Sequence, residues 1–251
     1  MNEELTARQK EAIFEKGYIK VPGLVSQKRI NVALRAINYS IGKGLDPKDV
    51  ERFRASSFCP ELQGTPPIAD LLYETGLLKL AESATERGKL KIAGSGQIAL
   101  RFPVMEYPGD PHPHLDGMYR PNNTVRKGTI FSFTLLAGVF LSDVPNRFWG
   151  NFTVWPGTHR SFEKYFKQHG ASSLLKGMPK IQMPEPEQIL ARAGDVILCH
   201  YQLAHTVVIN VSPYIRYAVF FRLMHQEHEK NRTEVFTNIW LEWMGIRERN
   251  N

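Results

Sequence analysis

Long apolar runs are absent from this sequence: no stretch approaches the roughly 18 residues that are needed to span a bilayer. The N-terminal segment is polar and charged and has no apolar core of the kind that marks a secretory signal. Cysteine is scarce, since only Cys59 and Cys199 occur, and their separation is not that of a metal site. We therefore expect a cytoplasmic protein without a membrane span, with two reduced, buried thiols.

Linkers, repeats and low-complexity tracts are also missing from the 251 residues. No Gly/Ser/Pro-rich segment divides the chain, so we expect residues 1–251 to form a single domain. The content of 42% hydrophobic and 23% charged residues is typical of a globular protein and argues against a disordered or fibrous one.

The formal charge of +7 would fit nucleic acid, an anionic membrane or an acidic small molecule. The basic residues are scattered, however, and are not interleaved with aromatic side chains that could stack on bases. A solvated surface is the preferred interpretation, and an anionic small-molecule substrate is compatible with it. We expect no nucleic-acid partner.

Helical patterns dominate the N-terminal part of the chain and return at the C-terminus. They cover residues 6–17, a segment after Ser26, about 68–86 and about 232–247. Thr6 and Gln9 have the spacing of a capping box at the start of the first helix. Residues 18–22 are expected to form a short edge strand, and the segment 160–188 a long, irregular insertion over the strands.

From residue 90 onward, short β-rich runs alternate with turn residues. The expected strands are 98–102, 129–134, 138–141, 151–155, 195–198, 206–209 and 217–221. This spacing is typical of an antiparallel sandwich or barrel. The predicted fold is therefore α+β but mainly β, a jelly roll of residues about 90–224 with the helices of residues about 1–88 and a C-terminal helix packed outside it.

The segment around His114 and Asp116 carries the strongest chemical signal. Side chains at i and i+2 of an extended strand point the same way, so these two residues can face one centre together. A third ligand is expected from His205, at the end of a later strand. Two histidines and one carboxylate on one side of an ion leave three coordination positions open, which suits iron(II).

Other histidines leave alternatives open. His112 has the same strand parity as His114 and is either an alternative ligand or a partner of the ligands. His200 is a rival for His205, but its opposite parity favours a packed or hydrogen-bonded role. Four more lie in turns or polar stretches and are expected at the surface: His159, His169, His225 and His228.

Arg216 lies eleven residues beyond His205 (216 − 205). A hairpin that turns at residues 210–213 would bring its guanidinium alongside His205, where it could bind the far carboxylate of a dicarboxylic chelator. A structural role at a strand edge is the alternative. Gln97 and Arg101 share one strand parity and could contact the same ligand, although a structural role fits them equally.

Several motifs in order resemble the phytanoyl-CoA dioxygenase family of iron(II)/2-oxoglutarate oxygenases. The motifs are Phe14 to Ser26, His114-Leu115-Asp116-Gly117, Trp155-Pro156-Gly157-Thr158-His159-Arg160, Ala193-Gly194-Asp195, His205 and Arg216. The resemblance implies a double-stranded β-helix with iron held by His114, Asp116 and His205. It also implies 2-oxoglutarate bound by Arg216, with Gln97 and Arg101 as further contacts.

Three features distinguish this chain within such a group. Asp116 separates it from related halogenases, which lack the carboxylate. Residues 135–143 lack a tryptophan that many relatives carry, and the basic loop 118–130 is longer than usual. We expect segments 118–130 and 160–188 to form a lid over the site.

The function implied is a dioxygenase that uses Fe(II), 2-oxoglutarate and O₂ to hydroxylate a C–H bond of a small molecule, with release of succinate and CO₂. Two alternatives stay open: a jelly-roll isomerase or lyase that uses a metal without 2-oxoglutarate, and a non-catalytic binding protein. The substrate and the oligomeric state are not specified by the sequence.

Overall fold

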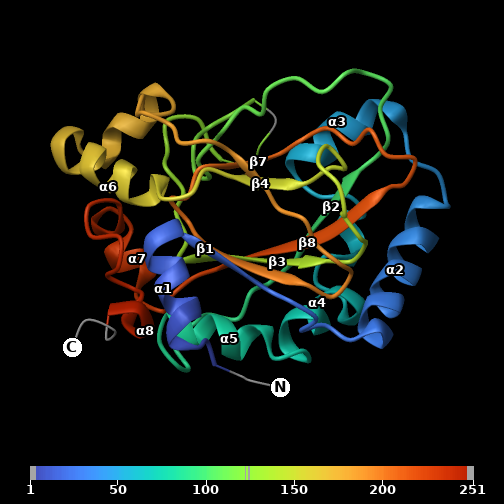
Figure 1. Ribbon diagram of the computed structural model, residues 1–251, viewed down its shortest axis with the longest axis horizontal. Coiled ribbons are helices and arrows are strands. Elements are labelled where there is room, and N and C mark those ends of the chain that lie inside the picture. Colours follow the sequence, from blue (N-terminus) through green and yellow to red (C-terminus); the bar gives the residue numbers. More distant parts are fainter. Residues whose placement is uncertain (1–3, 122, 124, 248–251) are drawn as a thin grey trace.

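The protein contains two antiparallel sheets with helices outside them, seen in a computed structural model that describes residues 4–121, 123 and 125–247 (Figure 1). The larger sheet has five strands in the order β1-β6-β3-β8-β2. Their bounds are β1 Tyr18–Val21, β6 Val196–His200, β3 Leu135–Phe140, β8 Arg216–Leu223 and β2 Gln97–Arg101. The expected edge strand at residues 18–22 is confirmed, since β1 pairs only with β6 among these strands.

The smaller sheet has three strands in the order β5-β4-β7. They are β5 Glu187–Gln188, β4 Phe152–Val154 and β7 His205–Val207. In Figure 1 the strands β4 and β7 lie opposite β3 and β8, and buried side chains of both sheets form one cluster. This arrangement confirms the predicted jelly roll, mainly β with flanking helices.

Alternate residues of the central strands serve two different cores. On β8, Ala218 and Phe220 point toward the smaller sheet, whereas Val219 and Phe221 pack against the helices. The same alternation divides β3, all of whose residues are buried. This period of two follows from the pleat of a strand, and it explains why these strands read as continuous apolar runs.

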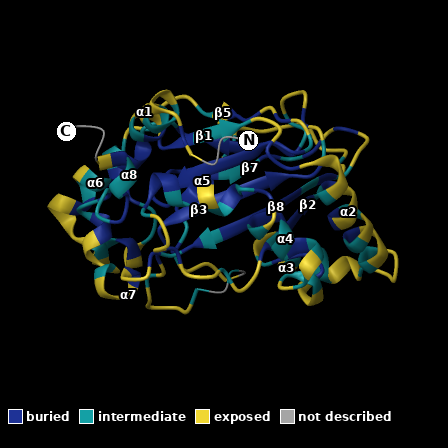
Figure 2. Ribbon diagram, turned by 90° about the horizontal axis from the view of Figure 1, so that it is seen from below, coloured by how far each residue is buried: buried dark blue, intermediate teal, exposed yellow. Residues whose placement is uncertain are grey.

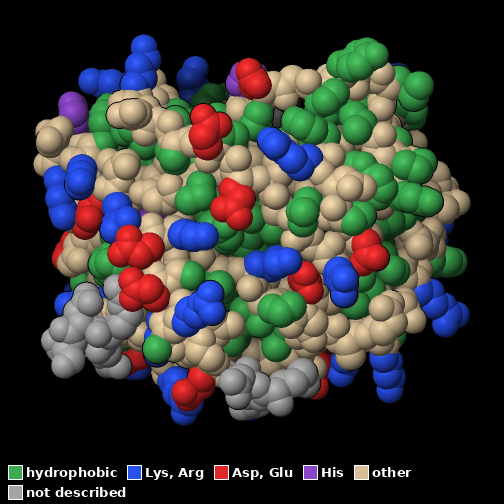
Figure 3. Space-filling model, viewed as in Figure 1, with side chains coloured by type: hydrophobic (Ala, Val, Ile, Leu, Met, Phe, Trp, Pro, Cys, Tyr) green, Lys and Arg blue, Asp and Glu red, His purple; other side chains and the backbone are tan. Residues whose placement is uncertain are grey.

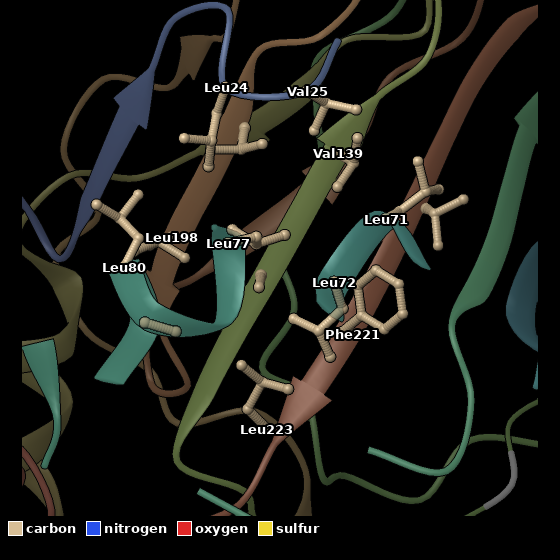
Figure 4. Close-up of a cluster of buried hydrophobic side chains, with 14 of the residues drawn as sticks. Leu24, Val25, Leu71, Leu72, Leu77, Leu80, Val139, Leu198, Phe221 and Leu223 are labelled. Carbon is tan, nitrogen blue, oxygen red and sulfur yellow. The ribbon is translucent and has the colours of Figure 1, made fainter. Parts of the chain in front are cut away.

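Five helices precede the strands β2 to β8, and their apolar side chains form one core with the larger sheet. Their bounds are α1 Ala7–Lys16, α2 Gln27–Ile41, α3 Pro47–Ala55, α4 Pro66–Tyr73 and α5 Leu77–Ala84. The capping box predicted for Thr6 and Gln9 begins α1. In Figure 4, Leu72 of α4 and Leu80 of α5 lie over Phe221 and Leu198 of the sheet. Figure 2 shows the exposed faces of α2 and α6 directed outward.

Two predicted helices are divided in the structure. The segment 68–86 forms two helices: α4 ends at Tyr73 with Glu74 as its C-cap, and Gly76, whose left-handed backbone has φ +81°, is the N-cap of α5 and prevents one continuous helix. The C-terminal segment forms only short pieces: α7 His228–Asn231, the 3-10 helix η3 Glu234–Phe236 and α8 Met244–Arg247. There the Ile239 carbonyl accepts a hydrogen bond from the His200 ring and not from a helical neighbour.

Two further expectations were wrong. Residues 129–134 are irregular and not a strand, because side chains of this segment bind the C-terminal region: Ser132 Oγ lies 2.9 Å from His228 Nε2, and Thr134 donates to Glu242. The supposedly irregular segment 160–188 contains most of α6, Thr158–His169, and the 3-10 helix η2 Ala171–Lys176. A third 3-10 helix, η1, covers Pro60–Leu62.

The surface is mixed in character. On the face shown in Figure 3, basic and acidic side chains are interspersed and do not gather in one basic patch. Across the described residues, no helix is both long enough and apolar enough to cross a bilayer.

Candidate metal centre

His114 and His205 are brought together by the backbone. The His114 N–H donates to the His205 carbonyl at 3.0 Å, and the His205 N–H donates to the His114 carbonyl at 3.1 Å. This reciprocal pair is an antiparallel bridge, and it places the two rings with their centroids 4.4 Å apart. The order of the sheet thus brings together residues that are 91 positions apart (205 − 114).

Asp116 completes a cluster with the two rings. Its Oδ1 lies 3.7 Å from His114 Nε2 and 3.7 Å from His205 Nε2. One ligand atom from each of these residues lies within 4.8 Å of the others, which is close enough to hold a metal ion. Two imidazoles and one carboxylate on one side of an ion form a facial set of ligands.

The surroundings of His205 keep its imidazole ring neutral, which is the form that can bind a metal ion. Its Nδ1 lies 2.9 Å from the Leu203 carbonyl, which assigns the proton to Nδ1 and leaves the Nε2 lone pair toward Asp116. Burial, together with His114, lowers the pKa of His205 to about 4, so that the ring is neutral near pH 7. A metal ion can therefore bind without first displacing a proton from this ring.

Asp116 has a partner that the sequence patterns did not reveal. Its Oδ2 accepts a hydrogen bond of 3.0 Å from Arg222 Nε and forms an ion pair with Arg222 Nη2, also at 3.0 Å. Burial raises the pKa of Asp116, but Arg222 and the two histidines outweigh this effect and hold the pKa well below its ordinary value. The even spacing of Arg216 and Arg222 in one strand could have revealed this partner. The two residues are six positions apart on β8, so they point to the same face of the sheet.

Arg216 is buried and only partly satisfied. Its Nε donates to the Gly150 carbonyl at 2.8 Å and its Nη1 to the Ala99 carbonyl at 3.0 Å, whereas Nη2 is buried without a hydrogen-bond partner. Burial and the charge of Arg101 lower the pKa of Arg216 well below its ordinary value. Within the described part of the chain, no acidic group lies within ion-pair distance, so this guanidinium has an unused donor for an anion.

The other two predicted contacts lie on β2. Arg101 is paired with Arg216 across the β2/β8 register and donates to the Leu100 carbonyl at 2.9 Å. Burial, followed by the charge of Arg54, lowers the pKa of Arg101 to about 10. Gln97 is at the other end of the strand, where its Oε1 accepts a hydrogen bond of 2.7 Å from Arg222 Nη1.

The predicted hairpin between His205 and Arg216 was wrong. Strand β7 belongs to the smaller sheet and β8 to the larger one, so the turn at residues 210–213 crosses between the two sheets. Both residues still border the space between the sheets. The Phe152 ring packs against His205 at 5.4 Å and against Phe220 of β8 at 5.2 Å, both between ring centroids.

The remaining histidines divide differently from the expectation. His112 is exposed and lies outside the cluster. His200 is buried, and its Nε2–H donates to the Ile239 carbonyl at 2.9 Å, as its strand parity indicated. His169 is exposed as expected, but His159, His225 and His228 are buried, because helix α6 and the C-terminal segment pack against the sheets.

A cavity of about 320 Å³ lies beside the predicted lid. It is bordered by residues 128–130, by Ala171 and Leu175 of η2, and by Arg232, Thr233 and Phe236. Both predicted lid segments therefore line one cavity, although the three cluster residues do not. Asn122 and Thr124, in the first segment, are outside the described residues.

Solved structures with the same fold include three proteins whose sequence identity to this chain is low. The non-haem α-ketoglutarate-dependent carbocyclase SnoK from nogalamycin biosynthesis matches with a TM-score of 0.58, 21% identity and coverage of 91% of this chain and 90% of that one. HygX from Streptomyces hygroscopicus, with nickel, 2-oxoglutarate and hygromycin B bound, matches with a TM-score of 0.57, 19% identity and coverage of 88% of each chain. EctD from S. alaskensis matches with a TM-score of 0.55, 17% identity and coverage of 90% of this chain and 79% of that one.

At these identities the comparison establishes the fold, which is shared by non-haem 2-oxoglutarate-dependent enzymes. No model of a protein family matches the sequence, and no curated protein matches it significantly. The narrower resemblance to the phytanoyl-CoA dioxygenase family therefore stays a prediction.

Proposed function

We propose that this protein is a non-haem iron(II)- and 2-oxoglutarate-dependent dioxygenase of the phytanoyl-CoA dioxygenase type. The observation that carries the proposal is the buried Nη2 of Arg216, which has no hydrogen-bond partner. A buried charged donor without a partner costs free energy, and a bound carboxylate would remove that cost. A dicarboxylate that chelates a metal at one end fits such a donor at its other end.

The cluster of His114, Asp116 and His205 also fits the proposal, because its donor atoms suit iron. His114, Asp116 and His205 supply two neutral nitrogens and one anionic oxygen on one side of a common centre. Three open positions are what a bidentate 2-oxo acid and O₂ require. When bound, iron and 2-oxoglutarate would supply the oxidising chemistry, with succinate and CO₂ as products.

The protein's own residues position the reactants and exclude water. In this proposal Arg216 fixes the far carboxylate of 2-oxoglutarate, and Arg101 beside it adds positive charge. Phe152 and Phe220 pack between the two sheets and limit access of water to the centre. Segments 118–130 and 160–188 close over the substrate as a lid.

The reaction outcome is proposed to be hydroxylation of a C–H bond in a small molecule, which the charge of +7 allows to be anionic. Structures of the same fold include a carbocyclase and an epimerase, and one contains hygromycin B. Because one scaffold serves several outcomes, succinate formation is a better first measure of turnover than a hydroxylated product.

The deciding experiment is anaerobic titration of the iron(II)-loaded protein with 2-oxoglutarate, monitored by the weak visible charge-transfer band of the chelate. We expect a band in the wild type, no band in His205→Ala, and a band that requires much more 2-oxoglutarate in Arg216→Met. Loss of a charged hydrogen bond of about 1.5–3 kcal/mol corresponds to a dissociation constant raised about 10- to 150-fold.

A matched control uses a different ligand and not a different protein. 2-Oxobutyrate has the chelating end of 2-oxoglutarate but no second carboxylate, so the wild type should bind it much more weakly, and Arg216→Met should bind both acids equally. A wild type that binds iron without any band would contradict the proposal. That outcome would favour a metal-dependent isomerase or lyase, whereas a folded protein that binds no metal would favour a binding protein.

A further inference from the structure

The two carboxylate oxygens of Asp116 have different neighbours: Oδ2 contacts Arg222, and Oδ1 faces the two histidines. Oδ2 accepts a hydrogen bond of 3.0 Å from Nε of the guanidinium and lies at an ion-pair distance of 3.0 Å from Nη2, whereas Oδ1 faces His114 and His205 at 3.7 Å each. A carboxylate whose second oxygen is held in this way offers a metal ion one oxygen only. The geometry matters because a second carboxylate oxygen on the ion would occupy a position that the reaction needs.

Arg222 is itself held in place from two sides. Its Nη1 donates to Gln97 Oε1 at 2.7 Å, and its Cζ lies 5.7 Å from the centroid of the fully buried Phe133 ring. Gln97 is on β2, Arg222 on β8 and Asp116 on the loop that precedes β3, so the network joins three separate parts of the chain. Such planar, multiple hydrogen bonding is a property of arginine that lysine lacks.

Charge alone does not explain an arginine at this position. A fixed positive charge beside Asp116 repels a divalent cation, and the cation would itself neutralise the carboxylate. What the guanidinium contributes is therefore the orientation of the ligand.

We propose that Arg222 is a positioning residue that restricts Asp116 to one metal-binding oxygen, and that Gln97 acts through Arg222. This inference rests on the proposed function only in taking the cluster to be a metal site, and it does not depend on 2-oxoglutarate. It assigns Gln97 a role different from the cosubstrate contact that the sequence suggested.

The test is titration of the metal-free, full-length protein with cobalt(II), with no 2-oxo acid present. Arg222→Lys keeps the charge but loses the planar set of donors, so we expect cobalt to bind about 10- to 100-fold more weakly than in the wild type. The visible absorption of bound cobalt should also change in intensity, because both oxygens of Asp116 can then reach the metal. The metal-free variant should remain folded, with a cooperative thermal unfolding transition like that of the wild type.

Arg160→Lys is the matched control, because Arg160 also pairs with a carboxylate, Glu15, but on an exposed surface. It should bind cobalt as the wild type does. Gln97→Ala should weaken cobalt binding in the same direction as Arg222→Lys, and adding it to Arg222→Lys should cause no further loss.

Equal cobalt affinity and equal spectra in Arg222→Lys and the wild type would overturn the inference. A Gln97→Ala variant that changes only 2-oxoglutarate affinity would overturn the part that concerns Gln97. A wild type that binds cobalt but shows no 2-oxoglutarate complex would refute the proposed function and leave this inference standing. Absence of cobalt binding would refute both.

Discussion

Gly117, directly after Asp116, is hydrogen-bonded to Phe131, the residue that follows the predicted lid segment 118–130. Its carbonyl accepts a hydrogen bond of 3.1 Å from the Phe131 N–H, and its backbone has φ +90°. A Cβ at this position would lie 1.8 Å from the Phe131 carbonyl oxygen. Because that neighbour is backbone and not a flexible side chain, Gly117→Ala must displace the 117–131 contact.

The cost can be separated into two contributions. A left-handed backbone conformation at alanine costs about 1–2 kcal/mol, and an unrelieved overlap in a packed region costs about 1–3 kcal/mol more. We expect Gly117→Ala to lower the free energy of unfolding by about 2–5 kcal/mol, which corresponds to roughly 2–4 °C of unfolding temperature per kcal/mol in a domain of this size.

Gly128 provides a matched control in the same loop. It has φ +80° but no atom within 4 Å of the position that a Cβ would take. Gly128→Ala should therefore lose only the backbone contribution of about 1–2 kcal/mol. Urea unfolding of both variants measures the difference, and equal losses would refute the argument that the Phe131 carbonyl limits position 117.

Two other predictions concern the buried interior. Burial raises the pKa of Glu242, but hydrogen bonds from His228 and Thr134 outweigh it and hold the pKa below 4.5; Glu242→Gln should be about 1.5–3 kcal/mol less stable at pH 7. A carboxyl group whose pKa is lowered by folding stabilises the fold at pH values above its ordinary pKa, and this contribution is lost as the pH falls through the lowered pKa. The stability deficit of Glu242→Gln should therefore persist down to about pH 5 and shrink below pH 4.5. A deficit in urea unfolding that does not depend on pH would contradict this prediction. Phe221→Ala, in the core of Figure 4, should cost about 3–5 kcal/mol, whereas Ile92→Ala, at an 84% exposed residue, should change stability by less than about 0.5 kcal/mol; comparable losses in thermal unfolding would show that position 221 is not a packing site.

Sequence patterns predicted the structure correctly where a residue's conformation depends mainly on its neighbours in the chain. The capping residues of α1 and the edge strand β1 were predicted because both depend on adjacent residues. The jelly roll was predicted because strands with a period of two and frequent turns have few ways to bury their apolar faces. The spacing of His114 and Asp116 likewise indicated a shared face, because alternate residues of an extended segment point the same way.

Two of the failures occurred where contacts with distant residues override the local preference. Residues 129–134 have strand-forming side chains, yet Ser132 and Thr134 bind His228 and Glu242, which are about a hundred residues away. The C-terminal segment has helical periodicity, but the hydrogen bond from His200 to Ile239 interrupts it. Periodicity measures intrinsic preference, and tertiary contacts of this kind override it.

By itself, the sequence determined the residue types of the candidate centre, the i, i+2 spacing of His114 and Asp116, and the shared parity of Arg216 and Arg222. The tertiary structure decided which residues meet: His205 pairs with His114, Arg222 holds Asp116, and one donor of Arg216 is left without a partner. The physical reason is that parity fixes the face to which a side chain points, whereas its partner depends on strand order and register, which are set by the packing of the whole sheet.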